Sequence, residues 1–435
     1  MSHKEHALEQ VSSQESLGVF KLAMVWAGFP FILAITITGS VFATSSDLYT
    51  ATAAIIVGSL LMFFYIGLLG EIGWKERRSF SQIAQRIFGD FGYVLIAGLL
   101  STLVLGWFTI NTAMPAEILA ASFHIPYWLV AIVLGIIFVA VTARGIIGMN
   151  MISNLSVPLF GALIFVAFAT LMGHTGGVSG DGLASVGNHT LTFQEILAGV
   201  LASFADSGTL APDFNRWATD RKASWLSVFA AFPLGFGFAM LAGVAFTAVL
   251  AMHGIRFDDP FQTANPVGYL IGLGGIFTVF AVVVAAVNQG SNATHCLYNS
   301  ILGFSKLSGQ HYVRTTLVVG TIGVIIAVTG VWAFLLDWLK IIGVLVPPIG
   351  AVVILAYFSG YYTKLGEKAA VGFTLAPWLS LASGWIFGLI VNFTSLARYL
   401  PVPIASFVIS AIAMGFLVKA AKQSTPPSKI VLDEE

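Results

Sequence analysis

The chain has 435 residues, of which 57% are hydrophobic and only 9% are charged, with 20 Lys and Arg against 20 Asp and Glu. A soluble domain carries about 25% charged residues, so this composition excludes a large soluble enzyme, a nucleic-acid binder and a secreted disulfide scaffold. Cys296 is the only cysteine, which rules out an internal disulfide and a cysteine-based metal site. We therefore expect an integral membrane protein. No nucleophile–base pair is visible in its apolar segments, so we expect it not to be an enzyme and to use no cofactor.

Apolar runs bounded by charges, proline or polar clusters predict twelve membrane-spanning helices, because a helix needs roughly 20 apolar residues to cross the hydrocarbon core. In chain order, we expect the spans at residues 18–43, 49–73, 91–120, 126–142, 152–173, 193–214, 224–251, 267–301, 315–335, 338–360, 371–394 and 401–419. Short segments of alternating hydrophobicity, the signature of barrel strands, do not occur. The predicted fold is all-α and lies in the lipid bilayer.

The basic residues are distributed unevenly between the two sides of the membrane. An even number of spans places both termini on one side, and that side holds all of the 20 Lys and Arg residues except Arg256, Lys340 and Arg398. Cytoplasmic segments carry such an excess of positive charge. We therefore expect cytoplasmic tails at residues 1–16 and 421–435, and an outer loop at residues 174–192.

A short amphipathic segment lies between the second and third spans. Phe80, Ile83, Ala84 and Ile87 recur at helical spacing, with polar residues on the opposite face. This pattern predicts a short helix in the inner membrane interface. It leaves open whether the helix is an ordinary linker or a moving gate element.

Two of the predicted spans contain helix-breaking residues near their centres. The first span carries Gly28 and Pro30, and the sixth, five spans later, carries Gly208 and Pro212. Interrupted helices at matching positions of two halves indicate the midplane binding site of a transporter, because the opened backbone can bind ligands. The alternative is that these residues only kink their helices, since glycine and proline are common in membrane helices.

Asp206 lies close to the middle of the sixth span. A carboxylate costs roughly 2.5–3.5 kcal/mol at the centre of a spanning helix, so such a residue normally faces a cavity or a partner. We consider three roles for it: an acceptor for substrate amino groups, a proton carrier, and a protonated group bonded to a neighbouring helix.

The eighth span carries a polar stripe on one helical face. Its members are Asn288, Ser291, Asn292, His295 and Asn299. Oxygen-bearing side chains facing opened backbone carbonyls favour a monovalent cation such as sodium. The alternative is a set of hydrogen bonds between helices.

Four segments resemble nucleobase:cation symporter family one, in its cytosine permease branch. They are LGWFTINTA in the third span, ASFADSGTLAPDFNRWATDRKAS in the sixth, NQGSNATHCLYNSILGF in the eighth and VPPIGAVVILAYF in the tenth. The resemblance covers nearly the whole chain and implies twelve helices in a LeuT-type fold that works by alternating access. It implies inverted five-helix repeats at residues 17–173 and 193–360, with discontinuous helices 1 and 6, and two further helices at residues 361–420.

The resemblance also implies the binding residues. Members of this branch sandwich the heterocycle between a tryptophan and a phenylalanine that match Trp107 and Phe204. An asparagine that matches Asn288 contacts both the substrate and sodium. The implied sodium ligands are the carbonyls of Gly28 and Phe31 and the side chains of Asn288, Ser291 and Asn292.

The chain departs from the family pattern around the ring edge. Val104 stands where the family has a glutamine, and Asp206 stands where it has a serine. A carboxylate accepts two parallel hydrogen bonds from an amidine-like edge, which favours an amino-substituted pyrimidine or purine. Ser203 and Ser207 remain as local hydrogen-bonding groups, and Asn292 replaces a hydroxyl residue, which leaves sodium and proton as alternative coupling ions.

We therefore expect a symporter of the bacterial inner membrane that imports a cytosine-like nitrogen heterocycle together with a monovalent cation. Asp206 and Asn288 read the ring edge in this interpretation. One alternative is a proton-coupled transporter of a non-aromatic amine or amino acid, with Asp206 as counter-ion and Trp107 as a cation-binding face. A receptor or channel without coupled transport is a further alternative.

Overall fold

The computed structural model describes residues 6–173, 183, 186–254, 265–330, 335–365, 372 and 374–424. These residues are almost entirely helical, and they contain one isolated β-bridge, between Leu17 and Ala218. Most of the expected outer loop and of the expected C-terminal tail lies outside the described residues.

The helices follow one another closely along the chain. The first are α1 (Val19–Ala27), α2 (Leu33–Ser45), α3 (Leu48–Glu76), α4 (Phe80–Phe123), α5 (Tyr127–Thr142) and α6 (Gly145–Met172). Then come α8 (Phe193–Ala202), α9 (Ala205–Thr209), α10 (Pro212–Asn215), α11 (Arg221–Phe229) and, after the π-helical segment Ala230–Phe236, α12 (Gly237–Met252). The last are α13 (Pro266–Leu273), α14 (Gly275–Ser308), α15 (Tyr312–Ala327), α16 (Leu335–Phe358), α17 (Tyr361–Lys364), α18 (Leu375–Asn392) and α19 (Val402–Ser424).

Eight helical segments within the described residues are long and apolar enough to cross a membrane. Four shorter helices, α2, α5, α8 and α15, are apolar as well. The starts of several helices are fixed by side chains that accept hydrogen bonds from free backbone N–H groups. Asp47 caps α3, Asp220 caps α11, and Thr192 forms a capping box with Glu195 on α8. The hydrogen bond from Thr50 holds the pKa of the Asp47 carboxyl below its usual value.

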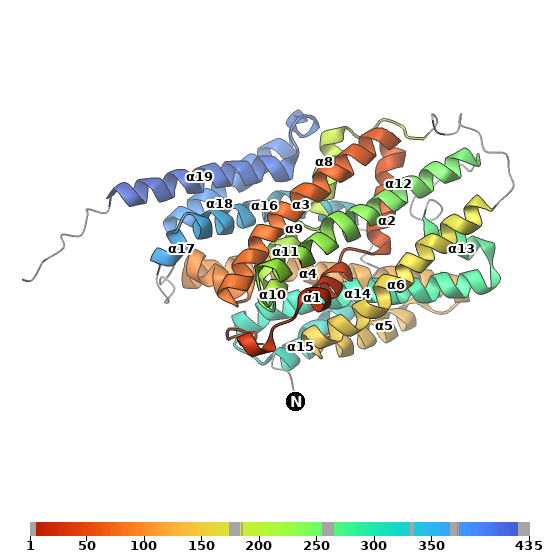
Figure 1. Cartoon of the computed structure of the whole chain (residues 1–435), viewed down its shortest axis with the longest axis horizontal. Coiled ribbons are helices and arrows are strands. Elements are labelled where there is room, and N and C mark those ends of the chain that lie inside the picture. The colour runs from red at the N-terminus through yellow and green to blue at the C-terminus, as the bar shows by residue number, and fades with distance from the viewer. Residues whose placement is uncertain are drawn as a thin grey trace, which may run out of the picture.

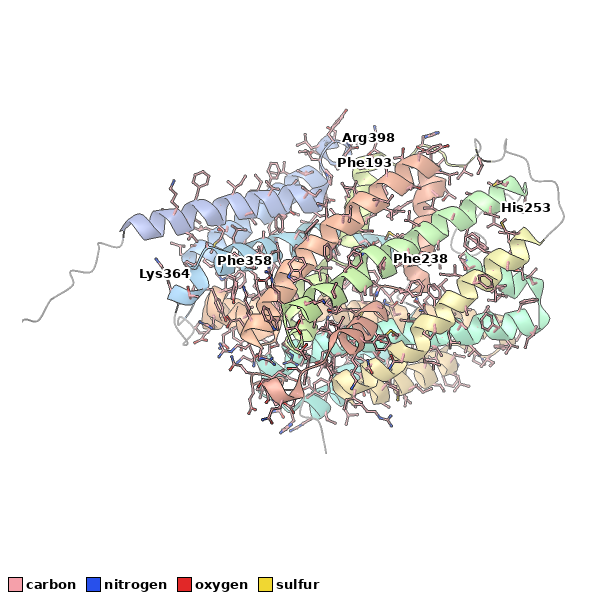
Figure 2. The ribbon with its side chains drawn as sticks, in the orientation of Figure 1. Phe193, Phe238, His253, Phe358, Lys364 and Arg398 are labelled. Carbon is pink, nitrogen blue, oxygen red and sulfur yellow. The ribbon has the colours of Figure 1, made fainter. Side chains whose placement is uncertain are left out.

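The helices are arranged as two groups around a central set. α16, α18 and α19 pack together along one edge of the molecule, while α5, α6 and α15 lie on the opposite side (Figure 1). α1, α9 and α10 lie between these groups. Figure 2 shows Lys364, at the end of α17, and His253, after α12, at opposite ends of the molecule.

The amphipathic segment after α3 forms a helix, but protein rather than lipid covers its apolar face. Phe80, Ile83 and Ile87 are fully buried, and the Phe80 backbone N–H donates to Asp213 Oδ1 on α10 at 2.8 Å. Gly89 then takes φ 82°, which allows the chain to bend into the long part of α4. Amphipathicity shows that a face is covered without showing what covers it, and the position of this helix in the inner membrane interface stays a prediction.

Residues 6–18, before α1, pack against the rest of the protein. Ala7 and Val11 are buried, and the Val11 N–H donates to the Arg77 carbonyl at 3.0 Å. Arg216 Nη1 donates to the His6 carbonyl at 2.9 Å. The segment therefore connects the end of α3 with the chain after α10.

Candidate functional site

Two helical rods are interrupted at the centre of the molecule. α1 ends at Ala27 and α2 begins at Leu33, and a second interruption separates α8, α9 and α10. Within the first gap, the carbonyls of Gly28 and Phe31 accept hydrogen bonds from side chains of α14. The open backbone of α1–α2 is therefore satisfied by α14, as buried polar groups require.

A cluster of buried oxygen atoms surrounds this gap. Ser291 Oγ donates to the Gly28 carbonyl at 2.8 Å, and Asn288 Nδ2 donates to the Phe31 carbonyl at 3.0 Å. Ser156 Oγ of α6 lies 3.1 Å from Asn288 Nδ2. The structure thus brings together Gly28, Phe31, Asn288 and Ser291, four of the five residues expected to hold a cation.

Asn292, the fifth of these residues, points in another direction. Its Nδ2 donates to Asn111 Oδ1 at 3.1 Å, and its Oδ1 accepts from Cys296 Sγ at 3.3 Å. Asn292 and Cys296 are one helical turn apart and both line an internal cavity. The structure therefore places Asn292 beside the cavity expected for the substrate.

This cavity has a volume of about 10 Å³ and lies beside the two interruptions. Its walls are formed by Ile32, Ala34, Ile35, Thr38, Trp107, Ser203, Phe204, Ser207, Asn292, Cys296 and Leu339. It thus contains four of the six residues expected to bind substrate: Trp107, Ser203, Phe204 and Ser207. A cavity of this size holds about one water molecule, so a ring-sized ligand requires the walls to move apart.

Asp206, the fifth expected substrate residue, is fully buried next to this cavity. Its Oδ1 accepts a hydrogen bond from the Ser207 N–H at 2.7 Å, whereas its Oδ2 has no partner among the described residues. The indole N–H of Trp107 is also unpaired there. The two side chains lie close to each other but do not reach the geometry of a hydrogen bond. Buried polar atoms are normally paired, so an unpaired acceptor and donor side by side form a natural place for a polar ligand edge.

Asn288, the sixth, belongs to the oxygen cluster and does not line the cavity. Its Oδ1 accepts from the Leu33 N–H at 2.8 Å, while its Nδ2 is bonded to Phe31 and Ser156. Val104 is fully buried, and it is not among the residues that form the cavity wall.

Aromatic rings from the gap after α1 and from the π-helical segment Ala230–Phe236 close the cavity beside Phe204. The Phe204 ring packs edge-on against Phe29, Phe232 and Phe236 with centroids 4.9, 5.5 and 5.8 Å away. Phe29 also stacks on His295, at 5.1 Å. All five side chains are buried, so a ligand cannot pass on this side until the rings separate.

His295, from the polar stripe of the eighth span, joins α14 to α1. Its Nδ1 lies 2.6 Å from the Ser291 carbonyl and its Nε2 lies 2.8 Å from the Val25 carbonyl. Asn299, at the far end of the stripe, is buried but its amide atoms have no partner among the described residues. Only part of the stripe therefore contributes to the oxygen cluster.

Sequence reasoning missed Ser153 and Ser156 of α6. Both are fully buried, and both face the oxygen cluster. Their spacing of three residues places them on one face of the predicted fifth span, which is the signal that would have identified them.

An all-helical membrane fold with two interrupted rods, a buried oxygen cluster and an enclosed cavity between them defines a membrane transport protein. Residues 11–374 match the family described as "Permease for cytosine/purines, uracil, thiamine, allantoin". The chain belongs to this family, which confirms the resemblance seen in the sequence.

Individual relatives agree with this assignment. The cytosine permease of Escherichia coli (strain K12) is 29% identical over 343 residues, which are 78% of each chain. The structure of MHP1, a nucleobase-cation-symport-1 family transporter, in a closed conformation with bromovinylhydantoin bound, aligns with TM-score 0.76 at 18% identity, over 94% of this chain and 95% of that one. A Na⁺-coupled sialic acid symporter aligns with TM-score 0.62 at 12% identity, over 92% and 89%. The two structural likenesses confirm the expected LeuT-type membrane fold.

Proposed function

We propose that this chain is a secondary active symporter that imports a nucleobase, or a related amino-substituted nitrogen heterocycle, together with a cation. Its membership of the cytosine and purine permease family supports the substrate class. The observation that carries the proposal is the unpaired Asp206 Oδ2 and Trp107 N–H beside a cavity that Trp107 and Phe204 line.

In this proposal, the heterocycle stacks between Trp107 and Phe204, and Asp206 accepts hydrogen bonds from its amino-substituted edge. Flat rings bind well between aromatic faces, with a few polar groups that fix their orientation. Ser203 and Ser207 lie in the same wall and serve as further partners. Asn288 acts from the oxygen cluster by holding the start of α2, whose residues Ala34 and Ile35 line the cavity.

The coupling ion is sodium in this proposal. Opened backbone carbonyls at helix interruptions are typical sodium ligands in transporters of this architecture. The carbonyls of Gly28 and Phe31 and the hydroxyl of Ser291 lie together there. Proton coupling through Asp206 is the competing mechanism, and the ion dependence of uptake separates the two.

The proposed membrane arrangement has twelve spans. The eight long helical segments supply most of them, and α2, α5, α8 and α15 complete the remaining spans. α1 with α2, and α8 with α9 and α10, are then the discontinuous helices 1 and 6 of inverted repeats at residues 17–173 and 193–360. Residues 361–420 form the two further helices, and both termini lie in the cytoplasm.

Uptake of labelled cytosine into proteoliposomes tests the function. We expect accumulation against a gradient when sodium is high outside, and none when potassium replaces sodium or an ionophore collapses the gradient. Amino-substituted pyrimidines and purines should compete, whereas simple amines and amino acids should not. The proposal fails if no heterocycle accumulates under either a sodium or a proton gradient.

Two tryptophan variants connect this uptake to the cavity. Trp107→Ala should weaken heterocycle binding about tenfold, because one stacking face is lost. Trp128→Ala is the matched control, because Trp128 lies on α5 with 55% of its surface exposed. Equal losses in both variants would contradict a binding role for Trp107.

A further inference from the structure

The hydroxyl groups of α6 lie against the oxygen cluster between α1 and α14. Ser153 Oγ is 3.5 Å from Ser291 Oγ, and Ser156 Oγ is 3.1 Å from Asn288 Nδ2. Both serines are fully buried. A third helix therefore supplies oxygen atoms at this point, besides α14 and the gap between α1 and α2.

Ser153 also lies directly against Gly28. A side-chain carbon at Gly28 would overlap the Ser153 side chain, so only glycine permits this approach. Ser291 Oγ bonds to the carbonyl of the same glycine at 2.8 Å. Gly28 and the hydroxyls of Ser153 and Ser291 therefore lie close together.

α14 by itself provides one hydroxyl too few for the site that the family resemblance implies. Asn292 stands at the second hydroxyl position, and its amide is bonded to Asn111 and Cys296, on the cavity side of the helix. The oxygen atom that completes the cluster must then come from another element, and Ser153 is placed to supply it.

We propose that Ser153 of α6 is a ligand of the coupling sodium ion, in the place that the family resemblance gave to Asn292. This inference rests on the proposed sodium symport. The Gly28 and Phe31 carbonyls and the Ser291 hydroxyl are the other ligands. All of these groups are neutral, which suits a monovalent ion, since divalent Ca²⁺ and Mg²⁺ sites are built with carboxylates.

The site then connects three helices. Bound sodium holds the segment between α1 and α2 against both α14 and α6. When the ion leaves, this segment loses its ion-mediated contacts with both helices at once. Phe29 lies in this segment, two residues after the end of α1, and packs against Phe204 in the aromatic closure of the cavity. Ion release and opening of that closure are therefore linked through the same segment.

A sodium titration of the purified full-length protein tests the role of Ser153. The melting temperature is followed with increasing NaCl at constant ionic strength, balanced with choline chloride, with and without cytosine. Ser153→Cys preserves the side-chain size against Gly28 but replaces the oxygen by sulfur, a poor sodium ligand. We expect Ser153→Cys and Ser153→Ala to raise the half-saturating sodium concentration about tenfold. Cytosine affinity at saturating sodium should be largely retained.

Ser227→Ala is the matched control, because Ser227 is equally buried but donates to the Ser224 carbonyl within α11. Its sodium response should equal that of the unaltered protein. The inference is overturned if both Ser153 variants keep the original sodium response, a result that leaves the symport intact. It is overturned as well if the unaltered protein binds cytosine but does not respond to sodium. If no heterocycle binds, the proposed function fails, while the titration without cytosine still decides whether Ser153 binds sodium.

Discussion

Asn288 caps the first helical residue of α2: its Oδ1 accepts a hydrogen bond from the backbone N–H of Leu33 at 2.8 Å. α2 has no capping side chain of its own, so a residue more than 250 positions away performs this role. The same amide donates from Nδ2 to the Phe31 carbonyl at 3.0 Å. Asn288 therefore fixes both the direction of a candidate sodium ligand and the start of a helix that lines the cavity.

Replacement of Asn288 by alanine should weaken sodium binding and cytosine binding together. The loss of a helix cap alone costs about 1 kcal/mol, and the Phe31 carbonyl also loses its partner. Binding of each ligand is measured by titration in the presence and absence of the other. Asn299→Ala is the control on the same helix, because the Asn299 amide is buried without a partner among the described residues. If Asn288→Ala weakens the binding of only sodium or only cytosine, Asn288 does not support both binding sites.

Asp206→Asn should weaken cytosine binding about tenfold, or about 1.4 kcal/mol, because the neutral amide loses a strong acceptor at the ring edge. Any pH dependence of uptake between about pH 5 and 8 should flatten, since a titratable group is removed from the site. Initial uptake rates across this pH range provide the measurement.

The control for Asp206→Asn is Asp213→Asn. Asp213 is also buried, but it does not line the cavity: its Oδ1 accepts from the Phe80 N–H, and an asparagine there retains an acceptor. Its cytosine affinity should be unchanged. If Asp206→Asn keeps both its affinity and its pH profile, neither role suggested for the carboxylate is correct.

The sequence predicted the helical architecture well because apolar length and helix-breaking residues are local properties. The interruption at Gly28 follows from residues within one span. Rotation about a helix axis is harder to predict: Ser291 and Asn292 are adjacent, yet one faces Gly28 and the other faces Asn111. Ser153 illustrates the same limit, because its spacing from Ser156 indicates a shared helical face but does not show that this face lies against Ser291 of α14.

Cys296 provides a native reporter of the cavity. It is the only cysteine of the chain, it lines the cavity, and 1% of its surface is exposed. Alkylation by a small membrane-permeant maleimide, followed by intact-mass spectrometry, should be slow. Saturating cytosine with sodium should slow it further, because a ligand between Trp107 and Phe204 blocks access to the thiol. Cys296→Ser gives the background, and labelling at an unchanged rate with ligand present would place the substrate elsewhere.

We expect the close approach of α2 and α12 to contribute to the stability of the folded protein. A side-chain carbon at Gly39 would overlap the Met240 carbonyl, and one at Gly243 would overlap the Thr36 carbonyl. Membrane helices associate through such tight packing of small residues, because lipid provides no hydrophobic driving force between them. Gly39→Val should therefore destabilise the protein by roughly 1–3 kcal/mol, as overpacking does in well-packed interiors. Gly161→Val on α6 is the control, since no other atom lies within 4 Å of a side-chain carbon built there. Melting temperatures measured in detergent should fall clearly for Gly39→Val and little for Gly161→Val, and equal values would show that the α2–α12 contact is looser than the structure indicates.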